Sequence, residues 1–234
     1  MLLNSEGVSI MLKIKNFKYY NMITVIFIVC LITANMGATK LFQFGSLVLP
    51  GGIIVFPLLY VINDILTEVY GFTASRRVIW LALFSNLFFT LILYAIVYFP
   101  PAEHHSNQES YANIFGLTPR IFIASLSSYF IGELLNASTI STLKIMQSGK
   151  NFAARAIIST CIGALVETAI FAGIAFGAIL PAHTLLMMVF TLTALKVLYE
   201  LLVLPITVKI TKYLKKVEGI DSYESPSLRG IFGW

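Results

Sequence analysis

Long apolar runs separated by short polar breaks follow one another along almost the whole chain. A membrane-spanning helix needs about 20 mostly apolar residues, and the sequence contains six runs of that kind. They cover residues 20–39, 51–70, 78–99, 120–146, 156–180 and 184–208. The pattern predicts an all-α, polytopic membrane protein with six transmembrane helices.

Proline and glycine residues mark the ends of several runs. Pro100 and Pro101 follow the third run, Pro181 follows the fifth, and Gly71 follows the second. Pro119 stands just before the fourth run, where it suits the first turn of a helix. Because proline lacks an N–H and clashes inside a helix, these positions support the predicted boundaries.

Composition agrees with this interpretation. Of the 234 residues, 58% are apolar and only 12% are charged, whereas soluble domains carry about 25% charged residues. The chain has two cysteines, which excludes a disulfide-dense secreted scaffold. Most of the chain is therefore expected to lie in lipid.

The distribution of Lys and Arg predicts the orientation, because cations concentrate in the cytoplasmic segments of membrane proteins. If both ends are cytoplasmic, the outer segments hold only Lys40 and Arg120, beside Glu103 and Glu109. The inner segments then hold Lys13, Lys15, Lys18, Arg76, Arg77, Lys144, Lys150, Arg155, Lys209, Lys212, Lys215, Lys216 and Arg229. The net charge of +5 is thus explained by topology, and no direct binding of nucleic acid is expected.

Three segments are expected along the chain. Residues 1–19 form a cytoplasmic N-terminal segment, residues 20–211 the six-helix transmembrane domain, and residues 212–234 a cytoplasmic C-terminal tail. Met11, which is followed by Lys13, Lys15 and Lys18, is the expected start of translation.

Polar residues inside the spans are the candidates for function, because a charge at the bilayer centre is costly and is usually retained for a purpose. They are Asn35, Asn63, Asp64, Glu68, Glu133, Asn136, Glu167, Lys196 and Glu200. At about 1.5 Å of rise per residue, Asp64, Glu133, Glu167 and Lys196 lie at one depth near the middle of the membrane. The sequence therefore predicts one polar layer built by four helices.

Structural roles compete with functional ones at several of these positions. Asp64 and Glu68 are one turn apart, and Glu68 could simply reach the inner interface. Lys196 and Glu200 are also one turn apart and could form an ion pair within their helix, although Glu133, Glu167 or Asp64 could equally serve as the partner of Lys196.

The amides and aromatic residues leave the same choice open. Asn35 and Asn63 are more typical of hydrogen bonds between helices. Asn136 lies one turn from Glu133 and shares its face. Tyr60, Tyr129 and Phe171 lie near the polar layer, where an aromatic ring could stack on a flat ligand.

Motifs of catalysis are missing from the sequence. It contains no GxxxxGK[ST] phosphate-binding loop, no HExxH and no GxSxG. We therefore expect a transporter or a solute-binding subunit rather than an enzyme, without a cofactor or a metal ion.

The segment FPLLYVINDILTEVYG at 56–71, followed by RRVIW at 76–80, resembles the queuosine precursor transporters, also described as vitamin uptake transporters. Three later segments fit the same family. They are GELLN at 132–136, the run from Ser159 through Glu167 to Phe176, and KVL at 196–198 followed by Pro205. The resemblance covers about residues 20–216.

The resemblance implies a bacterial inner-membrane protein that imports 7-deazaguanine precursors for tRNA queuosine salvage. The precursors are the 7-cyano and 7-aminomethyl bases, or queuine. The family also looks related in fold to the six-helix substrate-binding subunits of vitamin importers. Members can carry Gln, Asp and Asp where this chain has Glu133, Asn136 and Glu167, and a basic residue in place of Glu68.

A 7-deazaguanine presents N1–H and an exocyclic NH₂ side by side, which one carboxylate can accept in bidentate fashion. We expect Glu133 or Glu167 to bind that edge, Asp64 and Asn136 to complete the polar wall, and Lys196 to donate to the O6 side or to hold a carboxylate. The full set of candidate substrate-binding residues is Asp64, Glu133, Asn136, Glu167, Lys196, Glu68, Glu200, Tyr60, Tyr129 and Phe171.

Two other interpretations remain open from the sequence. The chain could be a binding subunit that depends on a separate ATPase module, or a membrane enzyme or assembly factor. The GxxxG pattern of Gly173 and Gly177 is compatible with a homodimer.

Overall fold

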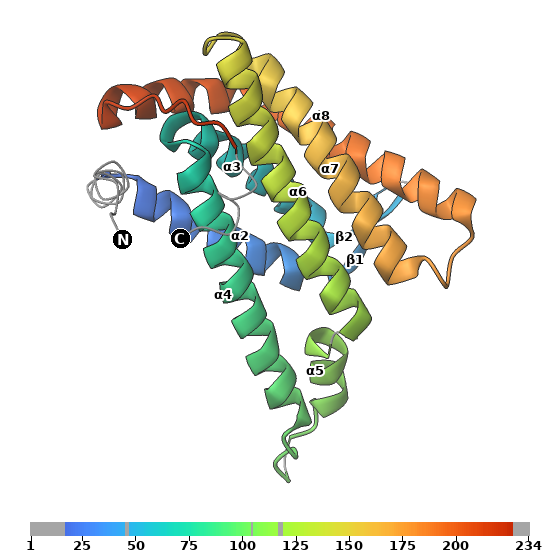
Figure 1. Ribbon diagram of the computed structural model, residues 1–234. Helices are drawn as coiled ribbons and strands as arrows, with labels where there is room; N and C mark the ends of the chain where they lie inside the picture. The colour runs from blue at the N-terminus through green and yellow to red at the C-terminus, as the bar shows by residue number, and fades with distance from the viewer. Residues whose placement is uncertain (1–16, 45–46, 104, 117–118, 227–234) are drawn as a thin grey trace, which may run out of the picture.

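A computed structural model describes residues 17–44, 47–103, 105–116 and 119–226 of the chain (Figure 1). The start at Met11, most of the N-terminal segment and the end of the tail lie outside these residues. Within them, six helices are long and apolar enough to cross a membrane. The long helices are α2 (Tyr20–Gly37), α3 (Phe56–Tyr70), α4 (Phe72–Tyr98), α6 (Pro119–Met146), α7 (Phe152–Phe176) and α8 (Ala182–Glu218). The prediction of an all-α membrane protein with six spans is confirmed.

The helix boundaries follow the punctuation of the sequence. Gly71 separates α3 from α4 with a backbone φ of +91°, a region that glycine adopts without steric cost. Pro119 begins α6, and Pro57 lies in the first turn of α3, after the short 3₁₀ helix η1 (Gly51–Ile54). α8 continues to Glu218, past the predicted end at residue 208, with Pro205 inside it.

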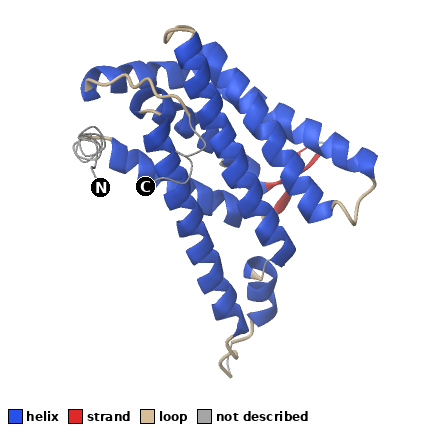
Figure 2. Cartoon of the chain, in the orientation of Figure 1, coloured by secondary structure: helices blue, strands red, loops and turns tan. Residues whose placement is uncertain are grey.

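Two elements outside the spans were not predicted. A two-stranded antiparallel hairpin pairs β1 (Leu41–Phe44) with β2 (Leu47–Pro50), with Leu41 opposite Pro50 (Figure 2). The short helix α5 (Gln108–Phe115) lies in the segment between α4 and α6. Both are too short to produce a clear hydrophobic period, so a scan for spanning runs cannot detect them.

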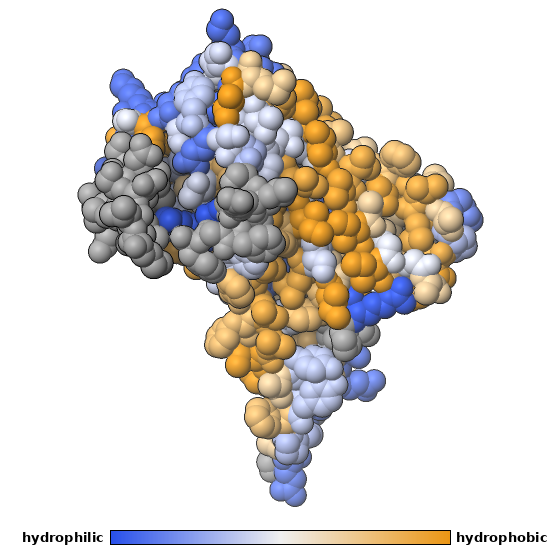
Figure 3. Space-filling model, viewed as in Figure 1, coloured by the Kyte–Doolittle hydropathy of each residue, from blue (hydrophilic) through white to orange (hydrophobic). Residues whose placement is uncertain are grey.

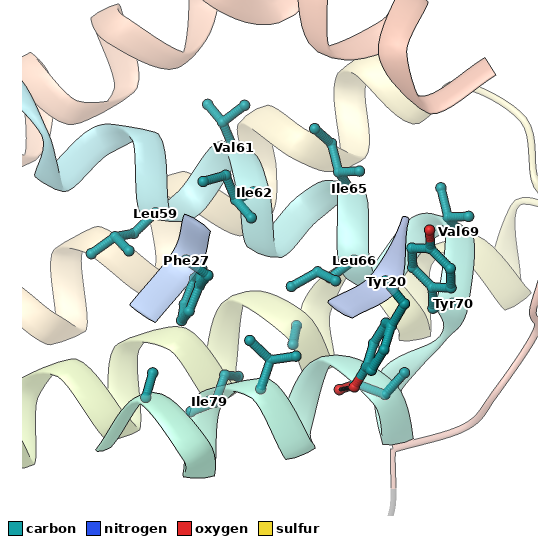
Figure 4. Close-up of a cluster of buried hydrophobic side chains, with 14 of the residues drawn as sticks. Tyr20, Phe27, Leu59, Val61, Ile62, Ile65, Leu66, Val69, Tyr70 and Ile79 are labelled. Carbon is teal, nitrogen blue, oxygen red and sulfur yellow. Dashed lines mark hydrogen bonds between the residues drawn. The ribbon is translucent and has the colours of Figure 1, made fainter. Parts of the chain in front are cut away.

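α3 is the central helix of the bundle. In the span Gly51–Tyr70, which contains α3, 72% of the hydrophobic 18-residue window is buried inside the protein, whereas the corresponding share in the other spans is 17–39%. Helix α3 packs against α2, α4, α6 and α8. Its apolar residues Leu59 and Leu66 lie in one cluster with Phe27 of α2 and Ile79 of α4 (Figure 4). Polar residues of α3 are consequently enclosed by protein rather than by lipid.

The outer surface of the bundle is apolar. Large apolar side chains are exposed along α4, α7 and α8, among them Phe88, Ile162 and Leu202. In Figure 3 an apolar band covers the middle of the molecule, and hydrophilic residues gather at its two extremes. This is the surface expected of a protein whose solvent is a bilayer.

One end of the bundle, here called the basic end, holds Arg76, Lys144, Arg155 and Lys215. Both ends of the described chain lie there, because the backbone N–H groups of Lys18 and Tyr19 donate to the Glu218 carboxylate at 3.1 and 2.8 Å. An even number of spans places the two ends of a chain on the same side of the membrane.

Candidate functional site

Polar residues of α3 provide one wall of the candidate site. Tyr60, Asn63, Asp64, Thr67 and Glu68 are all buried, the most exposed of them by only 1%. Their spacing of three or four residues places them on one side of the helix. The neighbouring helices α6, α7 and α8 bring the remaining polar groups to this side.

The Lys196 ammonium pairs with Glu167. The Nζ atom of Lys196 lies 2.6 Å from Glu167 Oε2 and 3.5 Å from Thr168 Oγ1. Tyr60 also donates its hydroxyl to Glu167 Oε2. The partner that the sequence left open is therefore Glu167 on α7, and not Glu200 on the same helix as the lysine.

Two aromatic rings flank this ammonium. Lys196 Nζ lies 5.6 Å from the ring centre of Tyr60 and 5.7 Å from that of Phe56, distances typical of cation–π contacts. Phe56 was not among the predicted residues. It stands at the very start of α3, and its nearness to Lys196 depends on how α3 and α8 pack.

Glu133 is held by an amide. Asn63 Nδ2 donates to Glu133 Oε2 at 2.5 Å and to the backbone oxygen of Glu133 at 3.0 Å. Ser75 of α4 donates its hydroxyl to Asn63 Oδ1. Asn63 thus joins α3, α4 and α6, which agrees with the expected role of an interhelical hydrogen bond and also positions the carboxyl group of Glu133.

Asp64, Asn136 and Glu200 retain unused hydrogen-bonding capacity. Asn136 Nδ2 donates to Asp64 Oδ1 at 2.6 Å. Asp64 Oδ2, Asn136 Oδ1 and both carboxyl oxygens of Glu200 have no hydrogen-bond partner among the described residues. All three side chains belong to residues that are 0% exposed. Buried polar atoms are normally satisfied, so these atoms are candidates to accept hydrogen bonds from a ligand.

Close contact between α6 and α7 brings these groups together. A Cβ atom on Gly132 of α6 would lie 2.6 Å from Glu167 Cβ. A Cβ atom on Gly163 of α7 would lie 3.0 Å from the Gly132 oxygen and 3.1 Å from Asn136 Cβ. Glycine at both positions lets the two backbones approach until Glu167 and Asn136 reach the face of α3.

Glu68 belongs to an ion cluster at the basic end. Its Oε2 atom lies 2.6 Å from Arg155 Nη2, and its Oε1 atom lies 2.6 Å from Lys215 Nζ. Lys144 Nζ lies 3.7 Å from Oε1 and donates to the Glu68 backbone oxygen at 2.6 Å. Both oxygens of Glu68 are therefore occupied by cations.

The C-terminal segment after α8 completes this cluster. Asp221 Oδ1 accepts from Lys144 at 2.5 Å and lies 2.9 Å from Lys215 Nζ. Partial burial alone would raise the pKa of Asp221, but hydrogen bonds from the two lysines outweigh it and lower the pKa below its ordinary value. Ser222 N donates to Val69 O at 3.3 Å. The segment is thus tied across the end of α3 (Figure 1).

The remaining predicted residues lie in other surroundings. The Tyr129 hydroxyl donates to the Ile79 backbone oxygen at 3.2 Å within the apolar core. The Phe171 ring packs edge-on against Phe176 at 5.9 Å. Asn35 donates to Asn86 at 3.2 Å and accepts from Ser125 at 3.0 Å, as expected of an amide that joins helices.

A surface pocket lies apart from the carboxylates. It is formed by α2, α4 and α5 and is predominantly apolar. The residues that line it are Asn35, Met36, Thr39, Asn86, Phe89, Thr90, Leu93, Ile114 and Phe115.

A six-span helical bundle that encloses a layer of carboxyl, amide and ammonium groups has the construction of a membrane transporter. A family model described as "putative vitamin uptake transporter" matches residues 50–210, and the chain belongs to this family. The match confirms the resemblance seen in the sequence, and with the relatives below it supports a transporter role.

Two relatives carry a more specific name. The chain is 27% identical over 175 residues to the probable queuosine precursor transporter of Bacillus subtilis, which covers 74% of this chain and 76% of the relative. It is 26% identical over 141 residues to the probable queuosine precursor transporter of Haemophilus influenzae, which covers 60% and 56%. No solved structure matches the chain.

Proposed function

We propose that this protein imports a queuosine precursor of the 7-deazaguanine type across the bacterial inner membrane. The names of the two bacterial relatives support this substrate class. The observation that carries the proposal is the set of buried, unpartnered oxygens on Asp64, Asn136 and Glu200. They accept hydrogen bonds, and a guanine-like edge is rich in donors.

The free oxygens favour a particular arrangement of the substrate. N1–H and the exocyclic NH₂ of the base donate to the carboxyl group of Asp64 or Glu200, because Glu133 and Glu167 already accept from Asn63, Tyr60 and Lys196. Glu133 and Glu167 then hold the wall of the site. The ring of Tyr60 stacks on the base. Tyr129, Phe171 and Glu68 do not contact the base in this arrangement and only support the surrounding structure.

Transport requires a change of conformation. Asp64, Asn136 and Glu200 are 0% exposed, so neither side of the membrane has access to them in this conformation. The basic end faces the cytoplasm in this proposal, because cations concentrate there. The cluster around Glu68 and the segment at Asp221 close the cytoplasmic route, and their opening would release the substrate.

Uptake in cells that depend on an external precursor tests the proposal. Asp64→Asn and Glu200→Gln should each reduce uptake at least about tenfold, because each removes a buried carboxyl group that the hydrogen-bonding edge of the base would meet, and a hydrogen bond to a charged group is worth about 1.5–3 kcal/mol. Glu109→Gln, on the exposed helix α5, is the matched control and should transport normally. Full uptake by both site variants at normal expression would contradict the proposal.

A binding screen with the purified chain identifies the ligand class. Thermal stabilisation by 7-deazaguanines, and not by guanine or vitamins, is the expected result. Uptake into vesicles that contain this protein alone separates an independent transporter from a binding subunit that needs an ATPase module.

A further inference from the structure

Negative groups outnumber positive ones in the polar layer. Asp64, Glu133, Glu167 and Glu200 face a single ammonium, Lys196, which lies 2.6 Å from Glu167. Three cations of the basic end, Lys144, Arg155 and Lys215, bind Glu68 and Asp221 instead. Three carboxyl groups of the layer are thus left without a cation among the described residues.

These three carboxyl groups differ in their hydrogen bonds. Asn63 donates to Glu133, and Asn136 donates to Asp64. Glu200 receives no donor from the described residues, although it is 0% exposed. A buried carboxylate with neither cation nor donor is strongly unfavourable, so Glu200 has the greatest need of a proton.

Asp64 is the second carboxyl group that can share this proton with Glu200. α3 and α8 pack against each other, and Asp64 and Glu200 are both 0% exposed and both have carboxyl oxygens without a hydrogen-bond partner among the described residues. Two like charges in one buried site disfavour double ionisation. The other buried titratable groups among the described residues of the surrounding helices are Tyr20 on α2, Tyr60, Glu68 and Tyr70 on α3, Arg76 on α4, Tyr129, Glu133 and Lys144 on α6, Arg155 and Glu167 on α7, and Lys196 on α8.

We propose that Asp64 and Glu200 form a proton-carrying pair and that the protein moves one proton inward with each substrate molecule. With one proton, the pair presents an ionised carboxylate and a carboxyl O–H. The carboxylate accepts from N1–H and NH₂ of the base, and the O–H donates to O6. With no proton the donor to O6 is lost, and with two protons the charged acceptor is lost.

The cycle balances in protons. Glu200 takes one proton from the outer side, the base then binds, and both groups become accessible to the cytoplasm when the basic end opens. The base leaves, the proton is released to cytoplasmic water that enters the open site, and the empty pair returns ionised and hydrated rather than buried and dry. Because only the singly protonated pair matches the base, the base does not cross efficiently without a proton. This inference rests on the proposed function.

Purified full-length protein in vesicles tests the coupling, with 7-cyano-7-deazaguanine as the probe. Potassium and valinomycin hold the membrane potential at zero, and a trapped dye reports the internal pH. For one proton per substrate, an inward gradient of about one pH unit supports about tenfold accumulation at equilibrium. Addition of the probe without a pH gradient should acidify the interior.

Glu200→Gln separates coupling from binding, because the amide of Gln can donate to O6 without a proton. This variant should exchange the probe more slowly than the wild type and independently of pH, and it should lose both accumulation and acidification. Asp64→Asn provides a second variant, which should lose accumulation and also bind the probe weakly. Glu109→Gln on α5 should behave as the wild type.

Three results would overturn the inference. In the first, the wild type exchanges the probe but a pH gradient does not make it accumulate. In the second, a sodium gradient drives accumulation of the probe instead. In the third, the Glu200→Gln variant still accumulates the probe when a pH gradient is applied. Failure of the wild type to bind or exchange any 7-deazaguanine would overturn the proposed function, and the coupling with it.

Discussion

Lys196 shows how a single residue depends on its neighbours in a low-dielectric interior. Lys196 is 7% exposed, and its ammonium has one carboxylate, that of Glu167, at 2.6 Å. Taking two charges out of water is costly, and the cost is offset only while both partners are present. Asn63 and Ser75 serve Glu133 in a similar way through neutral hydrogen bonds.

Removal of one partner should therefore be worse than removal of both. Lys196→Met or Glu167→Gln alone should lower stability by about 3–5 kcal/mol, because a buried group is left without its partner. The double variant should lose less stability than either single variant, because no buried charge is left without its partner. Thermal unfolding of the purified protein in detergent measures this difference.

Lys209→Met, an exposed lysine of the same helix, serves as the control and should leave the unfolding temperature nearly unchanged. If the stability loss of the double variant equalled the sum of the losses of the two single variants, Lys196 and Glu167 would not stabilise each other.

At the scale of elements, the contact between α6 and α7 and the central place of α3 decide the site. α3 supplies Tyr60, Asn63 and Asp64, and the glycines at the α6–α7 contact let the opposite wall approach it. The C-terminal segment, with Asp221 bound by Lys144 and Lys215, packs over the basic end. The elements thus enclose the layer from the sides and from one end.

Gly132→Ala should weaken the α6–α7 contact. The added methyl group would lie 2.6 Å from Glu167 Cβ, and overpacking of this kind costs about 1–3 kcal/mol. Substrate binding should fall together with the unfolding temperature, because Glu167 must move.

Gly173→Ala on α7 is the matched control, since a Cβ atom there meets nothing within 4 Å. It should be neutral or slightly stabilising, because alanine favours a helix over glycine by about 1 kcal/mol. If Gly132→Ala were equally neutral, close approach of the two backbones would not be what positions Glu167.

At the scale of the whole molecule, both ends of the described chain lie at the basic end, where Glu218 accepts from the N–H groups of Lys18 and Tyr19. The apolar flank between the two extremes (Figure 3) is the surface for the bilayer. Positive charge favours the cytoplasmic side for the basic end. The path of the chain thus places both ends on one side of the membrane, and the cation pattern predicts that this side is the cytoplasm.

Cysteine labelling tests this topology. In a variant without Cys30 and Cys161, an impermeant maleimide added to intact spheroplasts should label Asn107→Cys but not Lys216→Cys. Both replaced residues are exposed. Asn107 directly precedes α5 and Lys216 lies in the last turn of α8, and these two segments lie at opposite ends of the bundle (Figure 1). Lys216→Cys should react once the membrane is permeabilised. Labelling of Lys216→Cys in intact spheroplasts would reverse the orientation.

Sequence alone determined the membrane class, the six spans and the residues of the polar layer. Each of these properties is local: an apolar run of sufficient length must lie in lipid, and a charge within it, such as Asp64 or Lys196, is conspicuous. The start of α6 at Pro119 and the break at Gly71 were equally visible.

Only the tertiary structure decided which groups meet. The sequence allowed four partners for Lys196, and the packing of α7 on α8 selected Glu167. The packing of the helices also placed the Glu68 carboxylate against Arg155 and Lys215. It left Glu200 buried and without a hydrogen-bond partner among the described residues. Ion pairing and hydrogen bonding act over a few ångströms between helices far apart in the chain, so they depend on helix rotation and approach, which hydrophobic periodicity does not encode.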